Sequence, residues 1–207
     1  MKYYSQFSQD KYIYENCFKN KTDGFFVDIG ASDPIDGSNT MFFEELGWSG
    51  ILVEPIKKDY ENLLKVRKTP AENVAIYNKI GTFKFLLCGG YIKVLSGLLC
   101  EQHPKHLKRI INEFFAHGDS MEIIKIQTTT LEELLKKHNK TEIDYLSVDT
   151  EGSEYSILSN INFEKIHIKC ISVENNYNDS KIEDLLKSKG FEKINRLECD
   201  DIYLNKK

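Results

Sequence analysis

Acidic and amide side chains end two apolar runs in the second half of the chain. Asp149 follows the run 143–148, and Glu174 and Asn175 follow the run 166–173. If these runs are neighbouring parallel strands, their carboxyl ends meet at one edge of a sheet, where open α/β sheets bind ligands. Carboxylate and amide oxygens are hard donors that suit Mg²⁺ or Mn²⁺, so the three residues are predicted metal ligands. Hydrogen bonding to a ligand without metal, or capping of the following helices, are the alternatives.

A second candidate binding site lies near the N-terminus, in the stretch FFVDIGASDP. An apolar run at 25–29 contains Asp28, and small residues follow it: Gly30, Ala31 and Ser32. Glycine tolerates backbone dihedrals that other residues avoid, and small side chains let a ligand approach the main chain. The dinucleotide motif G-x-G-x-x-G is absent because the next glycine is Gly37, so no pyrophosphate cradle is expected.

An acid also ends the next apolar run. Glu54 follows the run 50–53 and precedes Pro55. In dinucleotide-binding folds a carboxylate at this distance from the glycine loop accepts hydrogen bonds from a ribose. The loop and Glu54 together predict a site for a nucleoside without phosphates. A generic turn followed by a surface glutamate is the alternative.

The elements that must position these residues alternate between strands and helices. Short apolar runs predict buried strands at 25–29, 50–53, 73–77, 143–148 and 166–173. Capping boxes that begin at Thr130 and Ser180 predict helix starts between or after them. This alternation predicts an α/β fold with a parallel sheet covered on both faces. Two further runs at 191–197 and 201–205 are joined by a turn too short for a crossover helix, so they predict an antiparallel C-terminal hairpin.

Residues 89–121 interrupt the alternation. Glycines at 89, 90 and 97 precede a helix pattern with one apolar face. We interpret the segment as an insertion or lid within a single domain of residues 1–207. A helix that only packs on the sheet is the alternative. His103 lies in this segment and is a candidate general base, although surface placement is the commoner outcome for such a histidine.

Composition narrows the class of protein. The chain has 207 residues, 41% of them hydrophobic, and a net charge of −4, which suits one domain and gives no basic footprint for nucleic acid. Its five cysteines are scattered without a C-x-x-C pair, which favours a reducing compartment. No apolar leader or membrane-length run is present, so we expect a cytoplasmic protein without a membrane anchor.

Several ordered blocks resemble one protein family over nearly the whole chain. The blocks are YYSQFSQDKYIYE, VDIGASDPIDGSNTMFFEELGWSGILVEP, TTTLEELL, IDYLSVDTEGSEYSIL and ISVENNY. They resemble the FkbM family of S-adenosylmethionine-dependent methyltransferases. This resemblance implies the Rossmann-like, seven-stranded methyltransferase fold, with a mostly parallel sheet and an antiparallel C-terminal hairpin.

The resemblance also implies which residues surround S-adenosylmethionine. The candidates are Gln9, Asp10, Asp28, Gly30, Ala31, Ser32, Asn39, Thr40, Glu54, Pro55, Asn73 and Val74. Asp28, Gly30 and Ala31 would line the methionine and ribose side, Glu54 would hold the ribose hydroxyls, and Asn73-Val74 would border the adenine. Helix capping is the alternative role for Asn39, and surface capping for Gln9 and Asp10.

The arrangement of Asp149, Glu174 and Asn175 is similar to that of metal-dependent O-methyltransferases, which implies catalysis at an acceptor hydroxyl. Glu151 and Glu154 are further candidate bases, and Glu154 at a helix start has a favourable interaction with the helix dipole as its alternative role. We expect a small-molecule or carbohydrate acceptor, such as a sugar, nucleotide-sugar or glycan, and self-association as a homo-oligomer is a further expectation. A non-catalytic module that binds S-adenosylmethionine, or a methyltransferase for another natural product, is the alternative function.

Overall fold

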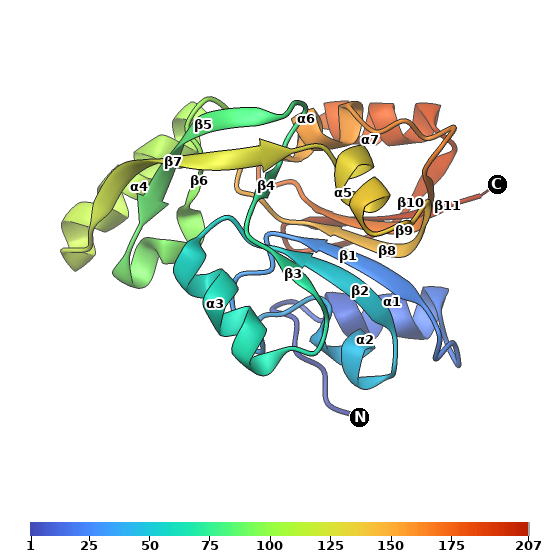
Figure 1. Cartoon of the computed structure of the whole chain (residues 1–207). Helices are drawn as coiled ribbons and strands as arrows, with labels where there is room; N and C mark the ends of the chain where they lie inside the picture. The colour runs from blue at the N-terminus through green and yellow to red at the C-terminus, as the bar shows by residue number, and fades with distance from the viewer. Residues whose placement is uncertain (207) are drawn as a thin grey trace.

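Two β-sheets organise the computed structural model, which describes residues 1–206 (Figure 1). The larger sheet has seven strands in the order β10-β11-β9-β8-β1-β2-β3. They are β1 (Phe25–Ile29), β2 (Ser49–Val53), β3 (Ala71–Glu72), β8 (Glu142–Val148), β9 (His167–Glu174), β10 (Phe191–Leu197) and β11 (Asp200–Asn205). The neighbouring strands β9, β8, β1, β2 and β3 pair in parallel, and β11 pairs antiparallel with both β9 and β10. The predicted α/β class, the mostly parallel sheet and the C-terminal hairpin are confirmed.

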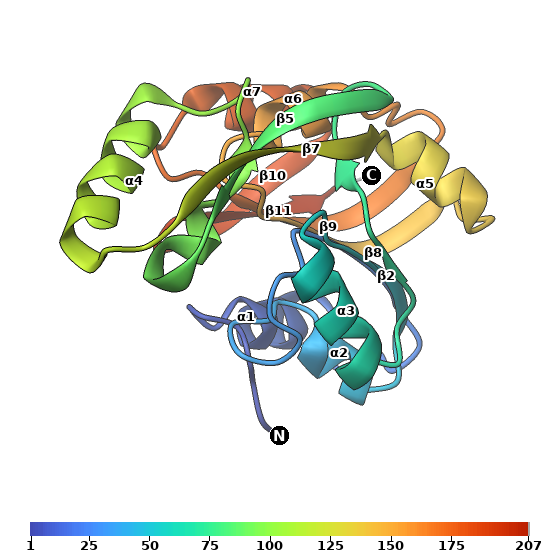
Figure 2. The same ribbon diagram turned by 60° about the vertical axis from the view of Figure 1, so that its left-hand side comes forward.

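Helices cover both faces of the large sheet (Figures 1 and 2). One face carries α1 (Gln9–Cys17), α2 (Met41–Glu45) and α3 (Lys57–Val66), and the other carries α5 (Leu131–Lys137), α6 (Glu154–Ser159) and α7 (Ser180–Ser188). Successive strand residues point to opposite faces, so Phe26 packs with the first set of helices and Val27 with the second. Both sides of the central strands are therefore buried.

Side chains define two of the helix starts. Thr130 Oγ1 accepts a hydrogen bond from the Glu133 N–H at 3.2 Å, as the sequence predicts. The prediction that Ser180 caps the last helix is wrong by one residue, because the Asp179 carboxylate accepts the hydrogen bond from the Lys181 N–H at 3.0 Å. A carboxylate at this position also interacts favourably with the helix dipole.

A second sheet lies above the carboxyl ends of the first. Its order is β4-β7-β5-β6, with β4 (Ala75–Ile76), β5 (Gly81–Cys88), β6 (Gly97–Leu98) and β7 (Met121–Thr129). The helices η1 (Gly90–Leu95) and α4 (Pro104–His117) connect its strands. The long strands β5 and β7 pair antiparallel from Gly81–Thr128 to Cys88–Met121.

The second sheet corrects one predicted strand, and two of its strands flank the predicted insertion. The run 73–77 does not form a strand of the large sheet, because its central residues form β4 and pair with β7. The interrupting segment at 89–121 lies between β5 and β7, two strands that the sequence reading did not predict.

In residues 1–206, no helix combines the length and apolar character that crossing a membrane requires.

Candidate active site

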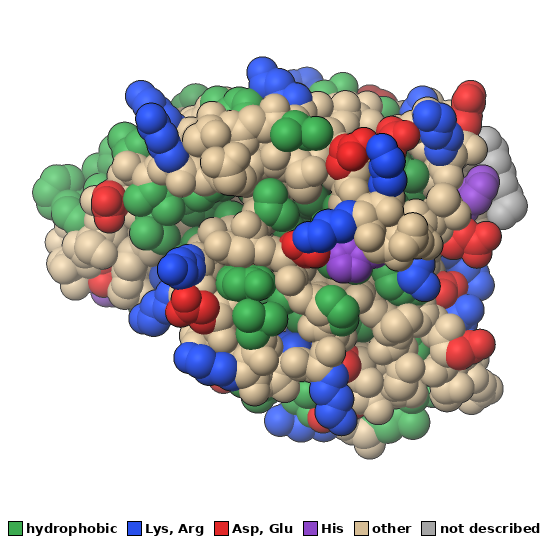
Figure 3. Space-filling model, in the orientation of Figure 1, with side chains coloured by type: hydrophobic (Ala, Val, Ile, Leu, Met, Phe, Trp, Pro, Cys, Tyr) green, Lys and Arg blue, Asp and Glu red, His purple; other side chains and the backbone are tan. Residues whose placement is uncertain are grey.

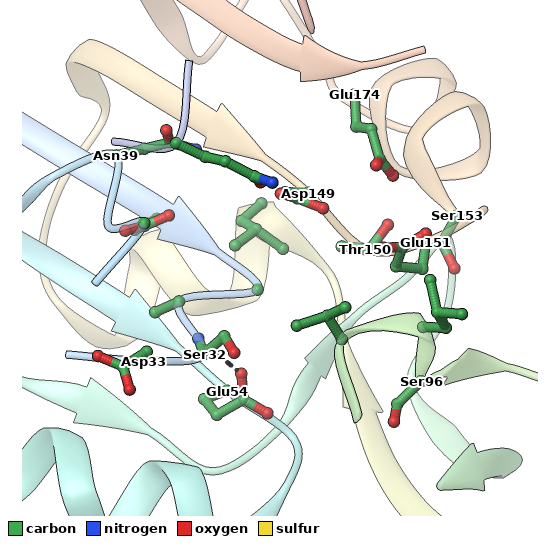
Figure 4. A pocket seen from close by; sticks show the side chains of 18 of the residues that line it. Ser32, Asp33, Asn39, Glu54, Ser96, Asp149, Thr150, Glu151, Ser153 and Glu174 are labelled. Carbon is green, nitrogen blue, oxygen red and sulfur yellow. Dashed lines mark hydrogen bonds between the residues drawn. The ribbon is translucent and has the colours of Figure 1, made fainter. Parts of the chain in front are cut away.

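A cavity of about 770 Å³ lies at the carboxyl ends of β1, β2, β8 and β9. This volume is within the range of typical small-molecule sites. Figure 4 shows Ser32 and Glu54 on one side of the cavity, and Glu151 and Glu174 on another. The N-terminal segment, η1, α4 and the turn between β10 and β11 complete the lining. Residues far apart in the sequence therefore meet in one site.

The turn after β1 explains why a glycine follows the strand. Gly30 has a φ of +88°, and a Cβ there would lie 1.8 Å from the backbone oxygen of Asp149. Its N–H donates to the Val53 carbonyl at 3.0 Å. The close approach of the neighbouring strand end requires glycine here, and no ligand needs to be invoked for that requirement.

Glu54 is buried at the cavity wall, 3% exposed. Its carboxylate accepts hydrogen bonds from the Ser32 N–H at 2.9 Å and the Ile56 N–H at 2.7 Å. Burial outweighs these bonds and raises the pKa of Glu54 to about 7. The alternative of a surface glutamate is therefore wrong. Pro55 also lines the cavity, beside Glu54.

Asp28 and Asn39 contribute polar atoms to the same cavity. Thr40 Oγ1 donates to Asp28 Oδ2 at 2.6 Å, while burial raises the pKa of Asp28. Asn39 Nδ2 donates to Ser147 Oγ at 3.1 Å. Asn39 Oδ1 is buried and has no hydrogen-bond partner within residues 1–206. An unpaired buried acceptor is costly, so this oxygen is ready for a donor from a ligand.

Three carboxylates gather on the other side of the cavity: Asp149, Glu151 and Glu174. Each offers an oxygen within 4.8 Å of the others. Burial and the repulsion of neighbouring carboxylates raise the pKa of all three, to about 8 at Glu151. Glu151 Oε2 is buried, and no residue of the described chain hydrogen-bonds to it. The sequence reading did not place Glu151 in this cluster, although its position two residues after Asp149 on one loop was the available signal.

Asn175 does not join the acids. Its Nδ2 donates to Asp201 Oδ2 at 2.9 Å and to the Asp179 carbonyl at 3.1 Å. Its Oδ1 accepts the Asp179 N–H at 2.8 Å. Both ends of the amide therefore hold the loop before α7, and the structure places Glu151 where the sequence reading placed Asn175.

The two candidate bases outside the cluster have structural contacts. Glu154 Oε1 accepts hydrogen bonds from Thr150 N–H at 2.9 Å and Thr150 Oγ1 at 2.7 Å. His103 caps α4 by accepting the Lys105 N–H at 3.1 Å, and its exposed ring stacks on Tyr177 at a centroid distance of 4.2 Å. Neither side chain lines the cavity, which supports surface placement for His103 and a structural role at the start of α6 for Glu154.

The remaining candidates for cofactor binding divide into cavity residues and supporting residues. Ala31 and Gln9 line the cavity, and the Gln9 amide donates to Asp200. Asp10 instead orders the N-terminal segment, because its carboxylate accepts the Tyr4 N–H and the Ser5 hydroxyl, each at 2.6 Å.

Asn73 and Val74 lie outside the lining. Asn73 Nδ2 donates to the carbonyls of Glu54 at 2.9 Å and Pro55 at 3.0 Å. The next two residues, Ala75 and Ile76, line the cavity in their place. Asn73 therefore holds the loop that carries Glu54, one layer behind the site.

The segment 89–121 supplies part of the wall. Lys93 and Leu95 from η1, Ser96 directly after it and Arg109 from α4 line the cavity. Gln102 Nε2 donates to the Glu151 carbonyl at 3.2 Å, so the segment is bonded to the loop that carries two of the acids. The segment therefore forms one side of the cavity, and its role as a lid stays a prediction.

Comparison with known protein families identifies the family of this chain. The model of the methyltransferase FkbM domain matches residues 28–193. The chain belongs to the FkbM methyltransferase family. A crystal structure of methyltransferase FkbM from Methylobacillus flagellatus KT has a similar fold, with a TM-score of 0.50 and 12% sequence identity. That similarity covers 94% of this chain and 50% of the other, so the chain spans about half the length of this FkbM relative. No protein with curated annotation matches the sequence.

Proposed function

We propose that this FkbM-family protein is an S-adenosylmethionine-dependent O-methyltransferase whose acceptor is a hydroxyl of a sugar, nucleotide-sugar or glycan. The observation that carries the proposal is the single cavity shared by Asp28, Glu54 and the three clustered acids. Family membership supports methyl transfer as the reaction class. The free cysteines of the described chain support a reducing, cytoplasmic location.

The cofactor half of the site is argued from Glu54 and Asn39. Glu54 lies at the end of β2, where a carboxylate accepts hydrogen bonds from ribose hydroxyls in nucleotide-binding folds. The unpaired Asn39 Oδ1 and the Asp28 carboxylate are acceptors suited to the ammonium of the methionine portion. These three residues line the same cavity, so one extended ligand can reach all of them.

The acid cluster fits a divalent cation. Asp149, Glu151 and Glu174 offer three hard oxygen donors, and the buried Glu151 Oε2 accepts no hydrogen bond from residues 1–206. A bound Mg²⁺ or Mn²⁺ would relieve the repulsion that raises the pKa of these groups, and it would favour ionisation of an acceptor hydroxyl. Without a cation, Glu151 is the candidate base for that proton, because its pKa is raised to about 8 and it lines the cavity.

The acceptor end is argued from polar residues around the acids. Residues 6–9 and the β10–β11 hairpin contribute hydrogen-bonding side chains to the lining: Gln6, Gln9, Arg196, Glu198 and Asp200. Such a wall matches the many hydroxyls of a carbohydrate better than an apolar molecule.

Self-association stays a prediction, supported by exposed apolar side chains of η1, α4 and β7 that gather at one end of the molecule (Figure 3), among them Tyr91, Ile111, Phe115 and Ile123.

Two measurements test the proposal. Calorimetry should show binding of S-adenosylhomocysteine, the demethylated product, to the wild-type protein. Incubation with methyl-labelled S-adenosylmethionine and a panel of nucleotide-sugars and glycans should transfer label to one acceptor, located by mass spectrometry. Preferential binding of a nicotinamide dinucleotide would contradict the cofactor, and tight cofactor binding without transfer to any acceptor would support a non-catalytic binding module.

A further inference from the structure

Arg67 lies directly after α3 and is 6% exposed, although it is outside every motif that the sequence reading singled out. Its Nε donates to Glu44 Oε2 at 3.0 Å. Its Nη1 donates to Ser38 Oγ at 3.1 Å, and its Nη2 to Thr40 Oγ1 at 3.2 Å. One buried cation therefore contacts the loop that leads from the cavity into α2.

The direction of these hydrogen bonds is fixed by chemistry. A guanidinium only donates, so Thr40 Oγ1 accepts from Arg67. The single hydroxyl proton of Thr40 is then available for Asp28, and it is given to Asp28 Oδ2 at 2.6 Å. Asp28 accepts this bond best as an ionised carboxylate. Arg67 thus acts on the charge and orientation of a cavity residue that it does not touch.

The same guanidinium also brackets Asn39. Ser38 and Thr40, the two neighbours of Asn39, are both held by Arg67. The Asn39 amide nitrogen is bonded to Ser147 Oγ, which leaves the unpaired Oδ1 in a defined position at the cavity. The chain has few ways to move this oxygen while Arg67 remains in place.

We propose that Arg67 is a positioning residue that, through Thr40 and Ser38, holds Asp28 and Asn39 as paired acceptors for the cationic amino group of the ligand. This inference rests on the proposed function, because it assigns the two acceptors to the ammonium end of S-adenosylmethionine. A purely structural ion pair with Glu44 would stabilise the loop but would not distinguish ligands with an amino group from ligands without one.

The test compares two nucleosides that share the adenosine and sulfur. S-adenosylhomocysteine carries the amino acid portion, whereas 5′-methylthioadenosine lacks it. Calorimetry with T40V and R67K should show S-adenosylhomocysteine binding weakened about tenfold in each variant, since hydrogen bonds to charged groups contribute on this scale. Binding of 5′-methylthioadenosine should stay within about twofold of the wild type. T40S keeps the hydroxyl and should bind both ligands like the wild type.

A double variant checks that the residues act in series. T40V/R67K should bind S-adenosylhomocysteine no more than about twofold more weakly than R67K alone, because both substitutions break one chain of contacts. If R67K does not fold, the comparison of T40V with T40S decides the proposal. Equal weakening of both ligands in T40V, or unchanged binding of both, would overturn it. Failure of the wild-type protein to bind either nucleoside would instead refute the proposed function.

Discussion

Glu151 Oε2 lies 3.6 Å from His106 Nδ1, across the boundary between the β8–α6 loop and α4. Burial lowers the pKa of His106 and raises that of Glu151 to about 8, so near neutral pH the pair carries little net charge. Glu151 therefore lies at the cavity wall with a pKa near the neutral range, beside two further acids whose pKa values are raised.

The unliganded protein should lose stability as the pH rises from about 4.5 to about 8. Glu54 and Glu151 have pKa values of about 7 and about 8 in the folded protein, against 4.5 for an unperturbed glutamate. The folded state therefore binds more protons in this window, and each group contributes stability that is complete below pH 4.5 and is lost by its folded pKa. For Glu54 the difference corresponds to about 3 kcal/mol.

Thermal or chemical unfolding between pH 5 and pH 8.5 checks this prediction, with E54Q and E151Q as comparisons. Each variant should flatten the pH dependence, because the amide has no proton to lose. Greater stability of the wild-type protein at pH 8 than at pH 5 would show that burial does not dominate these carboxyl groups.

Divalent cation should bind at the acid cluster and be required for turnover. Chelation with EDTA should abolish methyl transfer, and Mg²⁺ or Mn²⁺ should restore it. Asp149→Asn removes one charge with little change of shape, so it should weaken Mg²⁺ binding and reduce kcat far more than it weakens S-adenosylhomocysteine binding. Calorimetry with Mg²⁺ alone measures the first effect.

Glu198→Gln is the matched control for the cation. Glu198 lines the cavity but lies outside the cluster, so its loss should leave Mg²⁺ affinity unchanged. Full turnover of metal-free enzyme in chelator would exclude the ion, and the pH profile of kcat should then report the ionisation of Glu151.

Glu54→Gln should weaken S-adenosylhomocysteine binding by about 1.5–3 kcal/mol, because hydrogen bonds to a charged acceptor contribute on this scale. The amide keeps the size of the side chain, and one oxygen remains to accept a backbone N–H. Calorimetry at pH 8, where the wild-type carboxyl group is largely ionised, gives the cleanest comparison. Unchanged affinity would remove Glu54 from the ribose site.

Gly30→Ala should destabilise the fold severely, whereas Gly37→Ala should cost about 1 kcal/mol. Both glycines have positive φ, but a Cβ at residue 30 meets the Asp149 backbone oxygen at 1.8 Å, and a Cβ at residue 37 meets nothing within 4 Å. An alanine at position 37 therefore adds only the strain of a left-handed backbone. An alanine at position 30 would also push two strand ends apart. Urea unfolding of both variants measures the difference, and equal costs would contradict the close contact.

The sequence predicts the large sheet well because its strands are short apolar runs between helices, a local pattern. β1 begins and ends at the predicted residues, Phe25 and Ile29. The sequence does not predict the second sheet, because more than thirty residues separate β5 from β7. Their backbone hydrogen bonds join distant parts of the chain, and no local sequence pattern indicates that pairing. Alternation of Phe83, Phe85 and Leu87 on one face was the available signal.

Side-chain direction at the site was harder to predict than strand position. Asn175 follows β9 as expected, but its amide turns to the Asp179 backbone, which only the folded loop presents. Glu151 lies beside Asp149 and Glu174, and its backbone adopts a φ of +58°. Residues other than glycine rarely adopt this conformation, so the sequence does not predict it. The order of apolar runs along the sequence predicts the sheet edge that carries the site. The backbone dihedrals of the loops determine which acids meet there.

The second sheet, which lines one side of the cavity, has a hydrophobic core of its own. Phe85, Leu98 and Ile126 pack in one cluster and Leu86, Ile92 and Ile110 in another, separate from the two clusters that bury the large sheet. The two halves meet at Ile56, which packs against the first of these clusters and donates its N–H to Glu54. Because residues 81–129 supply one wall of the cavity, exchanging this segment between homologues should change acceptor preference in part, and the polar residues Gln6, Arg196 and Glu198 should carry the remainder.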